Sequence, residues 1–460
     1  MSESGGSGTI LAPLDVSNLQ AEGLLRQGTS SGTHRLHKRR LNRSSDEEHR
    51  DIPLEIPQND SAIQDAFASI PVYLISQETL THVGLSASKA EQLWSTWTNW
   101  PTDGPGRETD ADDGGLQVSF LDFITGHVTR SGIPDTTGED DTEWYTCLNA
   151  CGVDPKTQAA IMDPFFDDIR FDHTCLDWVR DTIKMRYAGL QDIQRASRER
   201  EKEIQRVASC LGPSGGGEWR PLSGLQQQSM AGISANVWGS ACAAAACNAP
   251  EYMVLYKGID QAHIEGMFDV DGNMDQISKL TSLPPSDFNN KAVMYYFTPN
   301  RKVAEYYAGY AKRRANCESV VMVVLCIPNA AIQSLTEPEI QHLHWPSDNW
   351  KQMIWNCRRN NNLPKRLRVY KEATLIIGSI SRKPNNVYHR LDTWEGVTER
   401  YLLKVKPDGR SGADGTIATQ YAIQGLEKGE DWLLENGGKD IKVFPYSHAA
   451  LESLIAENRD

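Results

Sequence analysis

The spacing of hydrophobic residues changes near residue 250, and this change divides the 460-residue chain into two structural parts. In residues 61–209, apolar side chains recur three and four positions apart, as in Leu93, Trp94 and Trp97, which is the period of an amphipathic helix. From residue 249 onward, apolar residues form short runs or alternate, as in Val320–Ile327, which is typical of strands. We therefore predict an α+β protein with a mostly helical region followed by a domain of strands and helices.

Two segments show neither period. Residues 1–60 are rich in Ser, Gly, Arg and acidic residues, and we predict a disordered N-terminal tail there. The basic cluster at residues 34–40 fits either a nuclear-import signal or a solvated patch. Residues 210–248 contain runs of Gly and Gln, and they are interpreted as a linker. The predicted boundaries are thus a tail, a helical region (61–209), a linker and a C-terminal domain (249–450).

Three strands of the C-terminal domain stand out because of their neighbours. Tyr252–Tyr256 and Val293–Phe297 are short apolar runs, and Thr298 and Pro299 after the second run supply an N-cap and a first-turn proline for a helix. Ile417–Ile423 alternates, which predicts Thr419 and Tyr421 on one face of a strand and Gln420 on the other. The pattern therefore predicts a strand that leads directly into a helix, and another strand in which Gln420 shares its face with small side chains.

Parts of these three strands resemble the signature of the PARP-like ADP-ribosyltransferases. In that family the first motif is an aromatic residue, His and Gly, the second is a Tyr-Phe pair that feeds a helix, and the third is Glu-Tyr followed by apolar residues. The matching segments here are Leu255–Gly258, Met294–Thr298 and Thr419–Ile423. The stretch between them also resembles a related domain family, at Trp350–Trp355 and Tyr370–Gly378. The resemblance covers about residues 250–445 and implies a split, mostly antiparallel sheet that binds NAD as a substrate.

The resemblance also implies roles for individual residues. Tyr296 would stack on the nicotinamide and Gln420 would engage the ribose, which makes these two the candidate catalytic residues. Lys257 would hold the adenosine side, and Gly258 would let the dinucleotide approach the backbone. The remaining candidate NAD-binding residues are Tyr295, Phe297 and Tyr421.

Two of these positions depart from the family pattern. Lys257 stands where His is usual, and an ammonium cannot accept a hydrogen bond. Gln420 stands where Glu is usual, so no negative charge at this position faces the oxocarbenium-like transition state. The loss of such a contact costs roughly 3 kcal/mol. Glu372 is a rival for the acidic role, in a segment that resembles a different motif.

The sequence consequently leaves three functions open. The first is a mono-ADP-ribosyltransferase with a protein acceptor, and the second is an NAD-binding protein without turnover. The third is a catalytically inactive pseudoenzyme or interaction scaffold with an accessory role in a specialised pathway. In that case the tryptophan-rich helical region would be the binding surface.

Composition limits the classes of binding partner and the cellular locations that we expect. A net charge of -14 and a pI near 5.3 argue against a nucleic-acid partner. The nine cysteines show no spacing typical of a disulfide framework, which indicates reduced thiols. No apolar run predicts a membrane span or a signal peptide. We therefore expect a cytoplasmic or nuclear protein. The sequence indicates no oligomeric state.

Motifs for metals and phosphates are weak in this sequence. Asp269–Asn273 resembles a calcium loop but has Leu280 at the twelfth position, so a turn is expected. The cysteine pairs lack zinc spacing, and we predict no metal site. The basic residues at 358–359 and 365–368 fit either phosphate binding or a solvated helix end.

Overall fold

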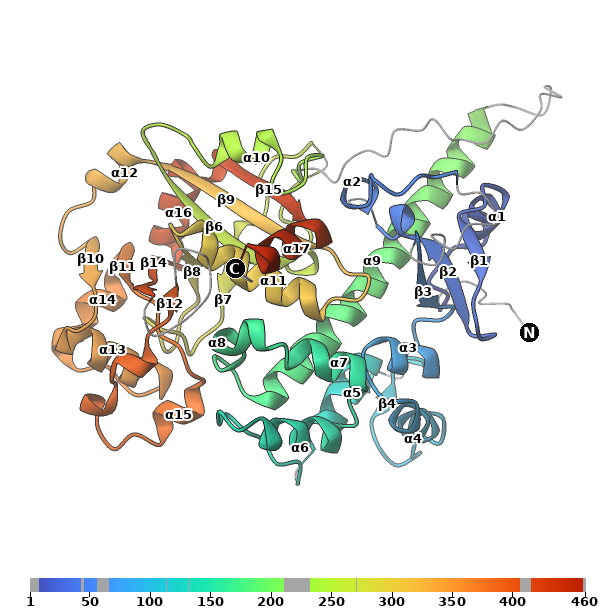
Figure 1. The fold of residues 1–460 in the computed structure, drawn as a ribbon, viewed down its shortest axis with the longest axis horizontal. Helices are drawn as coiled ribbons and strands as arrows, with labels where there is room; N and C mark the ends of the chain where they lie inside the picture. Colours follow the sequence, from blue (N-terminus) through green and yellow to red (C-terminus); the bar gives the residue numbers. More distant parts are fainter. Residues whose placement is uncertain are drawn as a thin grey trace.

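The computed structural model describes residues 8–42, 45–55, 66–112, 114–130, 132–210, 232–269, 271–405 and 415–457. It confirms a mixed α+β protein whose first half is mostly helical and whose second half holds several small sheets (Figure 1). Within the described ranges, no helix combines the length and the apolar character that a membrane span requires.

The N-terminal segment is folded, contrary to the predicted tail. It forms α1 (Pro13–Ala21), β1 (Leu25–Gln27), β2 (Thr33–His37), a 3-10 turn (Lys38–Arg40) and α2 (Ser45–Glu48), and β2 pairs with β3 (Phe67–Pro71). Leu19 and Leu36 pack in one core cluster with Leu190 of α9 (Cys175–Cys210). Buried Asp15 forms a 2.8 Å ion pair with Arg200 of the same helix.

The prediction of disorder over residues 1–60 is therefore wrong for residues 8–42 and 45–55. The reason is that this polar segment folds against a helix far away in sequence, which local composition does not reveal. Residues 1–7, 43–44 and 56–60 lie outside the described residues.

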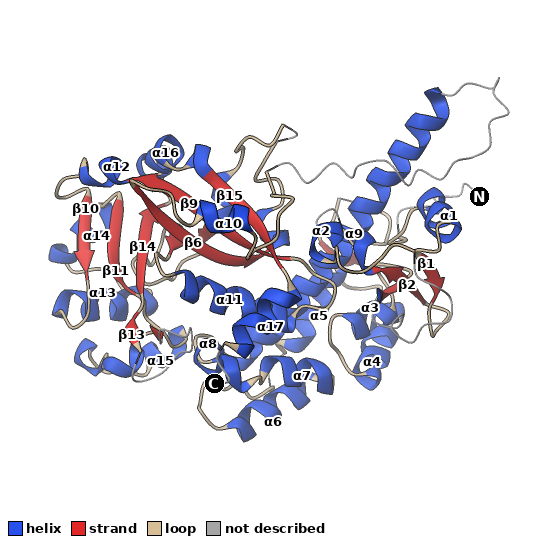
Figure 2. Ribbon diagram, turned by 45° about the horizontal axis from the view of Figure 1, so that its top comes forward, coloured by secondary structure: helices blue, strands red, loops and turns tan. Residues whose placement is uncertain are grey.

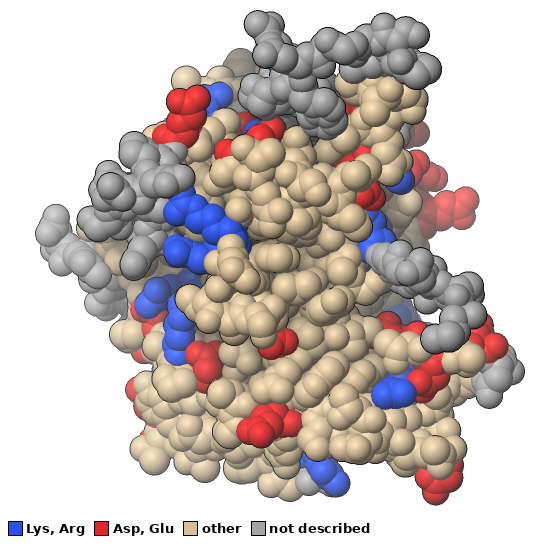
Figure 3. All heavy atoms as spheres, turned by 90° about the vertical axis from the view of Figure 1, so that its right-hand side faces the viewer, with Lys and Arg blue, Asp and Glu red and all other residues tan. Residues whose placement is uncertain are grey.

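The basic cluster at residues 34–40 belongs to this folded segment. Leu36 and His37 are buried, Arg39 forms an ion pair with Asp46, and the Arg35 guanidinium lies 5.7 Å from the centre of the Phe67 ring. Figure 3 shows the right-hand side of Figure 1, and few charged side chains lie at the centre of this view. The cluster is thus part of a folded segment, and its first residues belong to β2.

Helices of the central region pack around the first half of α9 (Figure 1). They are α3 (Gln77–His82), α4 (Ala87–Thr98), α5 (Phe120–Val128), α6 (Asp141–Cys151), α7 (Pro155–Ile161) and α8 (Asp167–Arg170), with the two-residue strands β4 (Gly106–Arg107) and β5 (Gln117–Val118). Trp97, Trp144 and Trp178 are buried in the core. These tryptophans therefore hold the helices together and do not form an exposed groove.

The C-terminal half contains two sheets of mostly antiparallel strands (Figure 2). Their strands are β6 (Tyr252–Asp260), β7 (Thr281–Ser282), β8 (Met294–Phe297), β9 (Val320–Pro328), β10 (Ile340–Leu343), β11 (Leu375–Ser379), β14 (Thr419–Gln424) and β15 (Ile441–Tyr446). One sheet has the order β10-β11-β14-β8-β7 and the other β15-β9-β6. Only the β10–β11 pair is parallel among the pairings of these strands. The sheets meet where Tyr256 and Thr298 exchange backbone hydrogen bonds of 2.8 and 3.0 Å.

Helices and shorter strands flank these sheets. They are α10 (Ala241–Ala246), α11 (Arg301–Arg314), α12 (Asn329–Gln333), α13 (Asp348–Arg358), α14 (Arg368–Glu372), α15 (Asn385–His389), α16 (Glu427–Asn436), α17 (His448–Ala456), β12 (Lys404–Val405) and β13 (Thr416–Ile417). The expected helix after Pro299 is α11, but it begins at Arg301 and Asn300 is its N-cap. The prediction that Thr298 caps this helix and that Pro299 lies in its first turn is therefore wrong.

Residues 232–248 also correct the predicted linker. Ile233 forms a bridge with Val443, and the buried Trp238 indole donates a 2.8 Å hydrogen bond to Glu305. The segment is therefore part of the folded core. Residues 211–231 of the predicted linker lie outside the described residues.

Helix α11 joins the helical region to the strands. On one side it packs so closely on β6 that a Cβ atom at Gly258 would lie 2.4 Å from the Ala304 carbonyl oxygen. On the other side, the Tyr306 hydroxyl donates to the Phe165 carbonyl at 2.8 Å and the Tyr310 hydroxyl to the Ile161 carbonyl at 3.0 Å. The helical region and the strand domain therefore share one hydrophobic core.

This shared core predicts that a substitution in the helical region destabilises the whole chain. Phe166 is fully buried against the rings of Tyr306 and Tyr310. We expect Phe166→Ala to lower the free energy of unfolding by about 3–5 kcal/mol, because it leaves a cavity between the two regions. Urea unfolding followed by fluorescence and circular dichroism measures this loss, with exposed Tyr145→Ala as the control. Two separate unfolding transitions would contradict the shared core.

Candidate functional site

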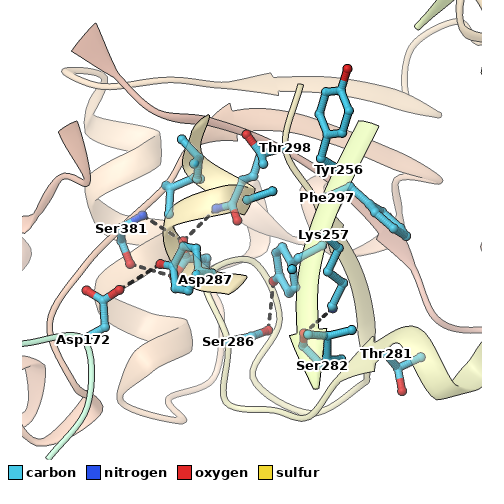
Figure 4. Close-up of a pocket in the computed structure, with 18 of the residues that line it drawn as sticks. Asp172, Tyr256, Lys257, Thr281, Ser282, Ser286, Asp287, Phe297, Thr298 and Ser381 are labelled. Carbon is cyan, nitrogen blue, oxygen red and sulfur yellow. Dashed lines mark hydrogen bonds between the residues drawn. The ribbon is translucent and has the colours of Figure 1, made fainter. Parts of the chain in front are cut away.

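A cavity of about 590 Å³ lies where β6, β8 and β14 meet α11 (Figure 4). Its size is that of a small-molecule site. Five of the predicted site residues line it: Lys257, Gly258, Tyr296, Phe297 and Gln420. The three motifs are far apart in sequence, and the sheet topology brings them to one place.

Tyr295 and Tyr421 lie on the opposite face of the sheet. The Tyr295 hydroxyl donates a 2.5 Å hydrogen bond to Glu430 of α16, and Tyr421 packs in the same core cluster. Successive residues of a strand point to opposite faces, and Tyr295 and Tyr421, each next to a residue that lines the cavity, point into this core. Phe297 belongs to the same core cluster and also borders the cavity. The structure therefore corrects the prediction that Tyr295 and Tyr421 bind a ligand here, because both side chains are core.

Tyr296 presents a fixed aromatic ring to the cavity. Its hydroxyl accepts a 3.0 Å hydrogen bond from the Phe288 backbone and lies 2.9 Å from the Ser286 hydroxyl. Burial raises the pKa of this phenol above its usual value, so the hydroxyl stays protonated. The ring is thus held at both ends, by its strand and by the loop between β7 and β8.

Lys257 supplies a positive charge without an opposite charge beside it. Its Nζ donates to the Leu280 carbonyl at 2.9 Å and lies 5.9 Å from the centre of the Phe297 ring. No carboxylate of the described residues forms an ion pair with it, and burial lowers its pKa to about 8. At neutral pH most of the molecules therefore carry a half-buried ammonium without a paired carboxylate at this end of the cavity.

Gly258 lines the cavity for a reason that the motif did not suggest. A side chain there would collide with the backbone of α11, as described above. Helix packing therefore requires this glycine, independently of any approach by a ligand.

Gln420 is held by a cluster centred on Asp287. The Gln420 Nε2 atom donates to Asp287 Oδ2 at 2.7 Å and contacts the Ser379 carbonyl at 3.4 Å. The same carboxylate accepts from Arg358 Nε at 2.8 Å, from the Ser381 hydroxyl at 2.6 Å and from the Ser381 backbone at 2.9 Å. The Gln420 amide hydrogens therefore point to protein acceptors and leave little donor capacity for a ribose.

This cluster explains why an amide stands at position 420. Asp287 is almost fully buried, and a second carboxylate 2.7 Å away would repel it. Arg358 neutralises Asp287, and although burial opposes its charged form, the Asp287 carboxylate raises the pKa of the guanidinium. Arg358 is consequently neither a solvated helix end nor a free phosphate-binding group. Sequence reasoning missed Asp287 because it lies in a loop without a recognisable motif.

Asp172 is a second acidic residue of the cavity, and it comes from the helical region. The Tyr307 hydroxyl of α11 donates to Asp172 Oδ2 at 2.8 Å. Burial raises the pKa of this carboxyl to about 6, and among the described residues no cation forms an ion pair with it. The nearby Arg382 pairs with Asp168 instead. In Figure 4, Asp172 and Lys257 lie on opposite sides of the site.

Other residues that the sequence singled out lie elsewhere. Glu372, the rival acidic residue, lines a different cavity. Asp269 accepts a 2.8 Å hydrogen bond from the Asn273 backbone, which confirms the expected turn. Within the described parts of the chain, no three potential metal ligands gather in one place.

Comparisons with protein-family models, with curated proteins and with solved structures found no match to this chain. The resemblance to ADP-ribosyltransferases therefore stays a prediction from three motifs. The geometry adds that five motif residues surround one cavity and that the amide at position 420 is engaged by a carboxylate.

The Asp287–Gln420 contact can be tested by exchanging the two groups. We expect Gln420→Glu to destabilise the fold by roughly 3 kcal/mol at about pH 7, because two buried carboxylates then share one position. One of them has a raised pKa in the folded protein, so this loss should shrink as the pH falls to about 5 and that group binds a proton.

The double variant Asp287→Asn with Gln420→Glu restores one acid and one amide. We expect it to be more stable than the Gln420→Glu single variant in urea unfolding at about pH 7. Asp287→Asn alone is the matched control, and it should cost about 3–5 kcal/mol because Arg358 loses its partner. Additive effects of the two substitutions would contradict a direct interaction.

Proposed function

We propose that this cavity binds NAD and that the chain is an ADP-ribosyltransferase-like NAD-binding protein with little or no transferase turnover. One observation carries the proposal: residues of all three motifs line the same cavity. Residues that agreed with the family by chance would have no reason to converge on one side of a split sheet.

The charges of the cavity support a ligand that carries both signs. Oxidised NAD has an anionic pyrophosphate and a cationic pyridinium ring. Lys257 offers a cation at one side of the site, and Asp172 offers a carboxylate at the other (Figure 4). Buried charges without partners are costly, and a ligand with this charge pattern would compensate both.

Tyr296 supports the same orientation. Aromatic rings bind other π systems by stacking, and a ring that is already fixed loses little entropy on binding. Its hydroxyl is bound by the loop at Ser286 and Phe288, so the ring face is the part left for a ligand. We propose that this face receives the nicotinamide.

Binding without efficient turnover follows from the surroundings of Gln420. The transition state for nicotinamide release develops positive charge on the ribose. An amide supplies no negative charge there, and the Asp287 carboxylate beside it is neutralised by Arg358. The alternative of a scaffold with a tryptophan-rich surface has less support, because Trp97, Trp144 and Trp178 are buried.

The charge pattern predicts two different effects on binding. We expect Lys257→Met to weaken the binding of both oxidised and reduced NAD by about tenfold or more, because both molecules carry the pyrophosphate. We expect Asp172→Asn to weaken the binding of oxidised NAD by about tenfold. The binding of reduced NAD should change little, because its nicotinamide ring is neutral. Isothermal titration calorimetry measures both affinities.

Two controls sharpen this measurement. Affinity of the wild type for oxidised NAD should fall as the pH rises above about 8, where Lys257 loses its proton, and the Lys257→Met variant should not show this fall. Absence of binding to the wild type would overturn the proposed function. Equal effects of Asp172→Asn on both ligands would overturn the orientation.

The proposal also predicts slow nicotinamide release. A site without the strand carboxylate should release nicotinamide about a hundredfold more slowly than one with it. We therefore expect purified protein with saturating NAD to show no release above that of the Tyr296→Ala variant, measured by chromatography. Clear release by the wild type that Tyr296→Ala abolishes would instead support an active transferase.

A further inference from the structure

A second cavity, of about 360 Å³, lies beside α14 and the end of β14. Its lining includes the cations Lys291, Arg368 and Lys371 and the carboxylate of Glu372. Among the described residues, none of the three cations forms an ion pair. The cavity therefore carries excess positive charge on a chain whose net charge is -14.

Polar side chains also line this cavity, and they are held in place. Asn290 and Gln424 are buried, with 5% and 8% of their surface exposed. The Gln424 amide donates to the Lys371 carbonyl at 3.1 Å, and the Asn290 amide donates to the Asn361 carbonyl at 2.5 Å. These contacts fix the backbone at Lys371 and at Asn361, on two sides of the cavity.

We propose that this cavity binds a small phosphate-bearing molecule through Lys291, Arg368 and Lys371. An arginine fork and lysine ammonium groups are the usual protein partners of phosphate oxygens. The volume lies near the lower end of small-molecule sites, which favours a ligand no larger than a mononucleotide. This site is independent of the proposed NAD site.

The two cavities border the same loop and the same helix end. Ser286 and Asp287 line the first cavity, whereas Asn290 and Lys291 line the second. Arg358, the last residue of α13, holds Asp287, and Asn362 beyond that helix lines the second cavity. An anion bound at Lys291 would therefore contact the segment that fixes one wall of the NAD site.

The experiment uses inorganic pyrophosphate as the probe, titrated calorimetrically into the full chain at low ionic strength. We expect Arg368→Ala and Lys371→Ala each to weaken binding roughly fivefold, as expected for one charge at the protein surface. The double variant should weaken it roughly twenty-five-fold if the effects add. Lys365→Ala is the matched control, because Lys365 is exposed on the preceding turn and does not line the cavity.

Three outcomes would overturn the proposal. The first is absence of pyrophosphate binding to the wild type. The second is an equal loss in Lys365→Ala, which would indicate diffuse attraction to the basic segment. The third is abolition of binding by Lys257→Met with no effect of Arg368→Ala, which would place the anion in the first cavity. Binding that Lys257→Met leaves unchanged supports the second site, whatever the outcome for NAD.

Discussion

The buried carboxylate of Asp287 is the contact on which the candidate site depends. It joins a loop, the end of α13, the segment that follows β11 and the strand β14 through hydrogen bonds to Arg358, Ser381 and Gln420. Burying a charged pair has a large desolvation cost, and only good geometry and additional hydrogen bonds offset it. Here the carboxylate receives those bonds from three chain segments. The cluster therefore fixes the cavity wall, and it is sensitive to the loss of any member.

This constraint also determines the chemistry at position 420. In the family that the motifs resemble, the third strand would bring a carboxylate to the ribose. Here the carboxylate comes from the loop before β8, and an arginine already neutralises it. An amide can lie beside such a carboxylate without repulsion, because its NH2 group donates a hydrogen bond to the carboxylate. Its partner Asp287 thus explains the Gln at this position, which is more than the loss of the family's Glu.

Local periodicity predicted the elements that carry the motifs. Alternation placed Gln420 and Tyr421 on opposite faces of one strand, and Pro299 indicated a helix that begins two residues later, at Arg301. Local patterns did not reveal contacts between distant segments. Asp172 and Asp287 reach the cavity only through the tertiary fold, and residues 8–42 are ordered because they pack on α9. Tyr295 was misassigned because the whole motif was taken as ligand-binding, although successive side chains of a strand point to opposite faces of the sheet.

The helical region and the strands act as one unit at this site. Tyr306, Tyr307 and Tyr310 of α11 each bond through their hydroxyl to the segment between Ile161 and Asp172. The same helix packs on Gly258, so one rigid element sets the positions of both walls of the cavity. Movement of the helical region would displace Asp172 relative to Lys257 and change the separation of the two unpaired charges. The charge pattern that suits a dinucleotide is therefore a property of the whole chain, and the three strand motifs alone would not produce it.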